Sequence, residues 1–232
     1  MDYILLGIVW YIILLISLTF HEASHSFAAM KLGDRTAYHQ GQVSLDPVVH
    51  IKREPFGTVI LPIISYALSG WMIGWASAPY DPYWAQRNRK KAAIMSLAGP
   101  AANLFLLITA ALIIRCGMIF GIFYAPESII FTRVTSATST GLGNSAAICV
   151  SILFSLNLIL FIFNLIPLPP LDGSNVLMFF LNDTTARQYE NFLYQPMYRI
   201  IGLVIAWQIF GHIFSPIHLL AINLLYPGAG YH

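Results

Sequence analysis

Apolar stretches long enough to cross a lipid bilayer alternate with short polar segments along this chain of 232 residues. A helix needs about 20 predominantly apolar residues to cross the hydrocarbon core of a membrane. Four stretches meet that length, and we predict transmembrane helices at residues 3–32, 92–115, 145–171 and 199–226. The expected fold is an all-α membrane protein, a bundle of four to six transmembrane helices that forms one domain over residues 1–232.

A fifth apolar stretch, residues 55–80, is interrupted by Pro62, Gly70, Gly74 and Pro79. Such breaks favour a re-entrant segment, which enters the membrane and returns to the same face where protein covers its backbone. We therefore expect a re-entrant segment or a short β-hairpin after the first helix. A full crossing at this point, within a six-helix arrangement, is the main alternative.

Positive charge gathers in the two polar loops that flank this fifth stretch. The loop at residues 31–53 holds four basic residues, and so does the short loop at residues 87–91. The positive-inside rule places both loops on the cytoplasmic side and the N-terminus outside. Two loops on one side require residues 55–80 to return to the face from which they start. The later halves of helices 3–32 and 145–171 then lie toward the same, cytoplasmic face.

The composition agrees with lipid as the main solvent. Hydrophobic residues make up 57% of the chain and charged residues 9%, whereas soluble domains are about one-quarter charged. A net charge of +2 without a basic patch gives no reason to expect a nucleic-acid partner. The two cysteines form no CxxC pair and indicate no disulfide framework. The first residues lack the basic start of a cleaved signal peptide, so residues 3–32 are interpreted as part of the mature protein.

The reactive residue types are concentrated in an HExxH motif, His21-Glu22-Ala23-Ser24-His25, within the first predicted helix. Histidines four residues apart differ by about 40° around a helix, so both imidazoles can face one metal ion. Glu22 then lies within reach of a water molecule on that metal. A chance match with structural histidines is the alternative, but it leaves three ionisable groups at membrane depth, where such groups mark functional sites.

A catalytic zinc ion needs a third protein ligand and an open position for water. The metzincin pattern would supply a histidine at position 31, where this chain has Lys31. The candidate carboxylates are Asp46, Glu54 and Asp172. Asp46 precedes a proline and is typical of a turn, and Glu54 follows two basic residues as a solvated charge.

Asp172 is the favoured third ligand because of the segment that it ends. Residues 164–173 read Asn-Leu-Ile-Pro-Leu-Pro-Pro-Leu-Asp-Gly at the close of the third apolar stretch. Prolines prevent a regular helix and free backbone groups, which a membrane tolerates only beside protein or a wet cavity. The alternative is that Asp172 caps a helix at residues 174–181.

At these residues the sequence resembles the site-2 protease family of intramembrane zinc metalloproteases, peptidase family M50. Three blocks carry the resemblance: His21 to His25, residues 98–103 (Ala-Gly-Pro-Ala-Ala-Asn) and residues 164–173. Their order matches the family, and together they frame residues 15–180. The likeness is to the compact branch of the family, which has no appended periplasmic binding domain.

The resemblance implies one zinc ion per chain, held by His21, His25 and Asp172, with Glu22 as the general base. Asn164 matches a family position near the zinc that is associated with the substrate or the oxyanion. The alternative for Asn164 is an amide that packs one helix against another.

Three further positions enter through the same resemblance. Gly99 and Asn103 match a place where helices pack closely, and small residues there favour a structural role. Ser77 is a departure, because related compact members often have a lysine near this position. A role of that lysine in lipid or substrate contact therefore does not carry over.

The expected function is zinc-dependent endoproteolysis within the membrane, of the kind called regulated intramembrane proteolysis. Its partners would be the lipid bilayer and a membrane-protein substrate, cut in or near a transmembrane helix. The active site should lie toward the cytoplasmic side of a multi-pass protein, and we expect a bacterial plasma membrane. The alternating residues 41–45 could form an edge strand that clamps extended substrate, or a self-paired hairpin.

Two other function classes are open. A non-catalytic zinc-binding membrane scaffold would keep the histidines but has no need of Glu22 as a base. A transporter is weaker, because the chain has no internal repeat that pairs two broken helices.

Overall fold

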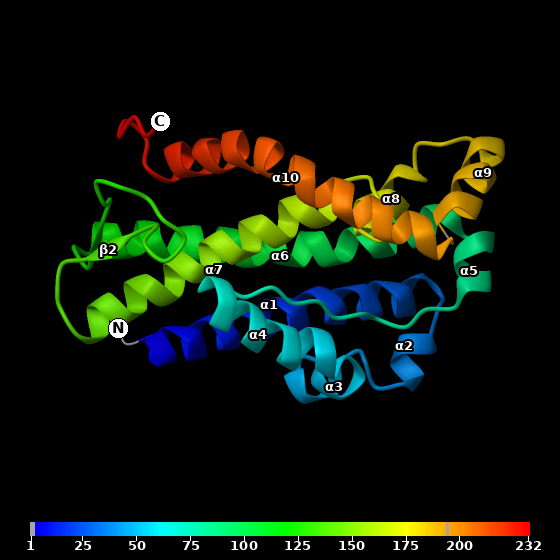
Figure 1. Ribbon diagram of the computed structural model, residues 1–232, viewed down its shortest axis with the longest axis horizontal. Coiled ribbons are helices and arrows are strands. Elements are labelled where there is room, and N and C mark those ends of the chain that lie inside the picture. The colour runs from blue at the N-terminus through cyan, green and yellow to red at the C-terminus, as the bar shows by residue number, and fades with distance from the viewer. Residues whose placement is uncertain (1–2, 194) are drawn as a thin grey trace.

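Long helices dominate the computed structural model, which describes residues 3–193 and 195–232. Four helices are long and apolar enough to cross a membrane: α1 (Tyr3–Leu32), α6 (Arg89–Ile119), α7 (Leu142–Leu165) and α10 (Pro196–Leu225). Successive long helices run in opposite directions, so the chain starts and finishes at the same end of the bundle (Figure 1). The predicted all-α membrane protein is confirmed, with four candidate spans in the described part of the chain.

The boundaries of the long helices differ from the prediction at the proline-rich segment. Helix α7 ends at Leu165 rather than at residue 171. A residue before proline is disfavoured in the helical region, and Ile166, which precedes Pro167, is extended with a ψ of 127°. Helix α6 is longer than predicted at both ends and includes Pro100.

The stretch after the first long helix turns back within the bundle, as predicted for a re-entrant segment. A π-helical turn (η1, Phe56–Ile60) leads into α4 (Leu61–Ser69). Gly70 ends α4 with a φ of 77°, a left-handed conformation that glycine adopts without strain. Residues 72–81 then run back as extended chain to the end of the bundle where α5 (Pro82–Arg87) begins (Figure 1).

Two tyrosines fix the far end of this re-entrant segment to the start of α1. The Tyr3 hydroxyl donates to the Tyr66 carbonyl at 2.6 Å, and the Tyr66 hydroxyl donates to the Tyr3 carbonyl at 2.7 Å. The two rings also stack, with their centroids 4.7 Å apart. The segment is therefore anchored to α1 at its turn.

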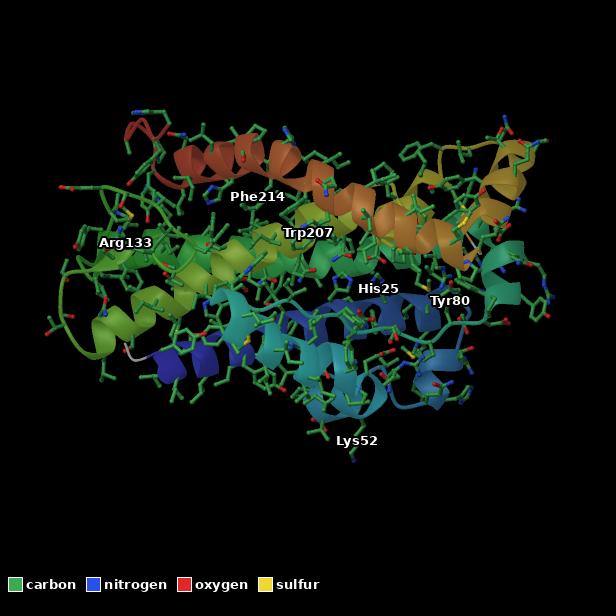
Figure 2. The ribbon with its side chains drawn as sticks, in the orientation of Figure 1. His25, Lys52, Tyr80, Arg133, Trp207 and Phe214 are labelled. Atoms are coloured by element: carbon green, nitrogen blue, oxygen red, sulfur yellow. The ribbon has the colours of Figure 1, made fainter. Side chains whose placement is uncertain are left out.

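Short helices lie nearer the end of the bundle where α1 finishes (Figure 1). They are α2 (Thr36–His39), α3 (Pro47–Arg53), α5, α8 (Asp172–Leu177) and α9 (Asp183–Leu193). Lys52 on α3 projects away from the bundle (Figure 2). The described strands, β1 (Phe123–Tyr124) and β2 (Ser136–Ala137), form an antiparallel pair between α6 and α7. The β-hairpin thus lies in a different loop from the one that follows the first helix.

The predicted edge strand at residues 41–45 is wrong. The Asp46 N–H donates to the Ser44 hydroxyl at 3.0 Å, and the Asp46 carboxylate accepts from the Val48 N–H at the start of α3. The His50 imidazole donates through Nε2 to the Ser44 carbonyl at 2.9 Å. These local bonds curl the segment, because Ser and Asp side chains satisfy backbone groups that a strand would offer to a partner.

Candidate metal centre

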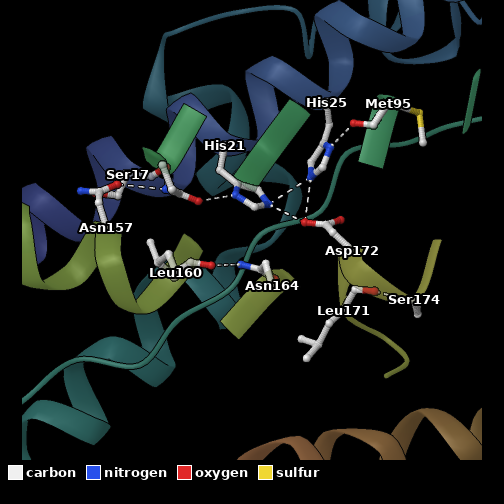
Figure 3. Close-up of polar contacts among 11 residues, drawn as sticks. Ser17, His21, His25, Met95, Asn157, Leu160, Asn164, Leu171, Asp172 and Ser174 are labelled. Carbon is white, nitrogen blue, oxygen red and sulfur yellow. Dashed lines mark hydrogen bonds and ion pairs between the residues drawn. The ribbon is translucent and has the colours of Figure 1, made fainter. Parts of the chain in front are cut away.

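Two imidazoles and one carboxylate converge where α1 meets the start of α8 (Figure 3). His21 Nε2 and His25 Nε2 lie 3.0 Å apart. Asp172 Oδ2 lies 3.1 Å from the first of these atoms and 3.3 Å from the second. Both histidines are buried, at 5% and 8% exposure. The structure therefore brings together the three residues that the sequence identified as metal ligands.

Local geometry explains how residues so far apart in sequence meet. The histidines share one face of α1 because they are four residues apart. The extended turn that follows α7, which contains a cis peptide bond between Pro169 and Pro170, delivers Asp172 as the first residue of α8. Gly173 allows this turn to fold back, since a Cβ there would overlap the Leu165 carbonyl.

Each imidazole is oriented through its Nδ1 atom. His25 Nδ1 lies 2.8 Å from the Met95 carbonyl, which can only accept, so this nitrogen carries the hydrogen. His21 Nδ1 lies 2.6 Å from Asn103 Oδ1 and donates to it. Metal-binding histidines commonly donate their second ring N–H in this way, which fixes the tautomer and the ring plane.

The donor set fits a zinc ion. In neutral imidazoles with hydrogens on Nδ1, each Nε2 presents a lone pair, and Asp172 Oδ2 then has no hydrogen-bond donor among the described residues. Three electron-rich atoms thus face one another without a hydrogen between them, an arrangement that a cation would stabilise. Two histidines and one carboxylate are a known catalytic zinc set, and they leave a fourth position for water or substrate.

Gly99 on α6 lies directly against both imidazoles. A Cβ at this position would overlap His25 Nε2 and His21 Nε2. Its absence therefore leaves space beside the metal ligands, and Asn103, one turn later, contacts His21. The sequence assigned both residues to helix packing first, and their contacts with the ligands go beyond that role.

Glu22 is placed for a role in the same centre. It follows His21 on α1, lies three residues before His25 and is only 5% exposed. A buried carboxylate beside a metal-binding pair is the arrangement expected of a general base in an HExxH motif. Its catalytic role stays a prediction.

Asn164 lies in the last turn of α7, close to the extended turn that leads to Asp172 (Figure 3). Its Nδ2 donates to the Leu160 carbonyl of its own helix at 3.0 Å. Within residues 3–193 and 195–232, no hydrogen bond joins it to a metal ligand. A role of Asn164 in substrate binding stays a prediction.

The other candidate carboxylates serve local structure. Asp46 caps α3. Glu54 accepts a hydrogen bond from the Ser77 hydroxyl at 2.6 Å.

Sequence reasoning missed two buried polar residues behind Asn103. Asn157 on α7 accepts from Asn103, and Ser17 on α1 accepts from Asn157. Their spacing held a signal, since Ser17 lies one turn before His21 and Asn157 lies two turns before Asn164. Polar residues that share a face with site residues inside apolar helices point toward the same centre.

Comparison with known proteins identifies the family. The sequence profile of Peptidase family M50 matches residues 9–208. The chain belongs to this family of metalloproteases, which includes the site-2 proteases. The fold and the HExxH helix described above agree with that membership.

Curated relatives carry names of the same kind. The chain is 34% identical to "Putative zinc metalloprotease YwhC" of Bacillus subtilis over 72% of its own length and 66% of the relative's. It is 30% identical to "Putative zinc metalloprotease Rip2" of Mycolicibacterium smegmatis and 29% identical to the Rip2 of Mycobacterium tuberculosis, each over 75% of its own length and 57% of theirs. The chain thus spans between about half and two-thirds of the length of these relatives. No solved structure matches it.

Proposed function

We propose that this protein is a zinc-dependent intramembrane endopeptidase that cuts membrane proteins in or near a transmembrane segment. One observation carries the proposal. A His-His-Asp cluster with a neighbouring buried glutamate lies among helices long and apolar enough to cross a membrane. A peptide bond that reaches this cluster would have to come from a chain that enters the same region.

The residues of this chain divide the chemistry among them. His21, His25 and Asp172 would hold one zinc ion, which when bound polarises a carbonyl and lowers the pKa of water. Glu22 would accept the proton of the attacking water and deliver it to the leaving amine. The hydrogen bonds from both Nδ1 atoms to protein oxygens would fix the ring planes and leave each Nε2 to bind the ion. Asn164, with an amide hydrogen to spare, is proposed to bind the substrate backbone or the developing oxyanion.

We propose that water reaches the centre from the cytoplasmic side. Lys52 lies at about the same level along the bundle as His25 (Figure 2), and the loops that hold most of the basic residues lie at this end. The positive-inside rule assigns such an end to the cytoplasm. Labelling of a cysteine introduced at Lys52 by an impermeant reagent in inverted membrane vesicles, but not in intact cells, checks this orientation. A membrane whose inner face contacts the cytoplasm is, in a bacterium, the plasma membrane, so we propose that the protein lies there.

The rival function, a non-catalytic zinc scaffold, differs in what Glu22 does. Glu22→Gln keeps the size of the side chain and removes its basicity. We expect cleavage of a co-reconstituted single-span substrate panel to fall by about 10²–10⁴-fold, the usual contribution of a general base. The zinc content should stay at that of the wild-type protein, because Glu22 is not a ligand.

Two variants control this experiment. Glu127→Gln makes the same chemical change in the exposed loop between α6 and α7 and should leave both readouts unchanged. Asp172→Asn should lower zinc content and cleavage together. Cleavage at the wild-type rate in both Glu22→Gln and Asp172→Asn would show that the His-His-Asp site does not cut the substrate, which rejects the protease and leaves the scaffold.

A further inference from the structure

A chain of buried hydrogen bonds leads from the His21 imidazole to the middle of the bundle (Figure 3). Asn103 Oδ1 lies 2.6 Å from His21 Nδ1, and Asn103 Nδ2 donates to Asn157 Oδ1 at 3.0 Å. Asn157 Nδ2 then donates to the Ser17 hydroxyl at 3.0 Å. Ser17, Asn103 and Asn157 are each 0% exposed. Three helices, α1, α6 and α7, each contribute to this chain.

Backbone carbonyls at the far end of this series of hydrogen bonds determine which group donates and which accepts along it. Asn157 Nδ2 lies 2.9 Å from the Leu153 carbonyl, and the Ser17 hydroxyl donates to the Ile13 carbonyl at 2.8 Å. A carbonyl accepts and never donates, so the NH2 group of Asn157 must face Leu153. The oxygen of Asn157 must then face Asn103.

The orientation of Asn157 fixes that of Asn103, which in turn fixes the position of the hydrogen on His21. Because Asn157 offers Asn103 an oxygen, Asn103 turns its NH2 group toward Asn157 and its oxygen toward His21. A second, longer contact of 3.5 Å from the same nitrogen to the Ser17 carbonyl favours the same orientation. His21 Nδ1 must carry a hydrogen to donate to that oxygen. Its Nε2 keeps a lone pair, which points at His25 and Asp172.

We propose that Asn103, Asn157 and Ser17 form a one-way relay of hydrogen bonds that holds His21 in the tautomer able to bind the metal. The inference rests on the proposed metal site. If Asn103 were rotated by half a turn, its NH2 group would face Nδ1, and the ring hydrogen would move to Nε2. That hydrogen would point at the metal position and exclude the cation. Asn157 and Ser17 are therefore positioning residues that touch neither metal nor substrate.

Metal affinity tests the relay independently of proteolysis. We choose cobalt(II), titrated into the detergent-solubilised full chain and followed by its visible absorption in competition with a chelator. Asn157→Ala frees Asn103 to rotate, and we expect cobalt to bind about tenfold more weakly, at the lower end of the effect of losing an outer partner of a metal ligand.

The variant Asn103→Asp separates the relay from a packing effect. Both carboxylate oxygens accept, so either orientation of Asp at 103 presents an acceptor to His21 Nδ1. We expect this variant to bind cobalt at least as well as the wild type. Adding Asn157→Ala to it should produce no further loss, because nothing remains to be oriented. A packing defect would instead appear equally in both backgrounds, since independent effects add.

Two more variants complete the test. Asn157→Asp, whose carboxyl at this fully buried position would be neutral, keeps an oxygen toward Asn103 and an O–H toward the Leu153 carbonyl, and should retain affinity even if Asn157→Ala folds poorly. Ser155→Ala removes a different buried hydroxyl of α7, which donates to the Phe131 carbonyl at 3.0 Å, and should leave cobalt affinity unchanged.

The outcomes are distinct. An equal loss from Asn157→Ala in the wild-type and Asn103→Asp backgrounds overturns the relay, as does the absence of any loss in the wild type or a loss in Asn157→Asp. A wild-type protein that binds no cobalt overturns the proposed metal site itself. A loss of cobalt affinity from Asn157→Ala in the wild-type background, with none in the Asn103→Asp background, supports the relay.

Discussion

The metal centre and helix α10 are held in place by contacts of different kinds. In the most apolar parts of α1 and α6, the helices that meet at the two histidines, 39% and 44% of residues are buried, whereas the corresponding share of α10 is 17%. Around the metal ligands, helices approach so closely that a single glycine, Gly99, separates α6 from two imidazoles. Along α10, most apolar side chains face outward, as expected of a helix that lies against lipid.

Helix α10 is attached at a few places. Gly202 lies against the Pro169 carbonyl near its start, and the Trp207 ring lies 6.5 Å from that of Phe163. Figure 2 shows Trp207 and Phe214 on the side that faces the bundle. At its other end, the Tyr226 hydroxyl donates to the Val134 carbonyl at 2.8 Å. The difference teaches that the residues in contact with the metal ligands come from α1, α6 and α8, and we expect a small shift of α10 to leave the histidines in place.

The largest effect is expected from Gly99→Ala, which tests the close packing around the metal ligands. The added Cβ overlaps the Nε2 atoms of His21 and His25, which are ends of side chains and can rotate away. Rotation preserves the fold but breaks the hydrogen bonds that orient the rings. We expect metal affinity to fall on the order of 100-fold, the upper end for changes around metal ligands, with little change in thermal unfolding.

Gly211→Ala on α10 is the matched control, because nothing lies within 4 Å of its Cβ position. It should keep the wild-type metal affinity. Wild-type affinity in Gly99→Ala itself would mean that the imidazoles are not confined as described.

The same substitution on α10, Gly202→Ala, should lower the stability of the protein and have little effect on metal affinity. Its Cβ overlaps the Pro169 carbonyl, a backbone atom that cannot rotate aside. Because α10 is weakly attached, we expect it to shift, at a loss of about 1–3 kcal/mol of stability, as for other overpacked sites. Metal affinity should change far less than in Gly99→Ala. Calorimetry and cobalt titration on the same preparation check both parts, and a loss of affinity as large as that of Gly99→Ala would show that α10 controls the Asp172 turn.

The metal centre was also more predictable from the sequence than the segments around it. Periodic and compositional signals located the four long helices, since a membrane demands long uninterrupted apolar runs. The HExxH motif and Asp172 could be identified because ionisable groups are rare at that depth. In contrast, the bond from Asn103 to His21 depends on the distance between two helices, which no local pattern specifies.

Local competition explains the errors elsewhere. Residues 41–45 alternate like a strand, but Ser44 and Asp46 satisfy nearby backbone groups and curl the chain. Helix α7 ends at Leu165 because Pro167 restricts the residue before it. Both outcomes follow from side-chain and backbone sterics over a few residues, which a search for apolar runs does not weigh.

The smallest expected effect concerns the hydrogen bond between Tyr226, at the C-terminal end of α10, and Val134. Tyr226→Phe removes one hydroxyl and leaves the carbonyl of Val134, a residue with 0% exposure, without that donor. We expect a loss of about 1–2 kcal/mol in the free energy of unfolding and no change in cobalt affinity, because the contact lies at the end of the bundle opposite the metal centre. Tyr124→Phe, which alters a half-exposed ring in the same outer loop, should change neither quantity. A fall in cobalt affinity in Tyr226→Phe would contradict the separation, since it would mean that a change at the end of α10 reaches ligands on α1 and α8.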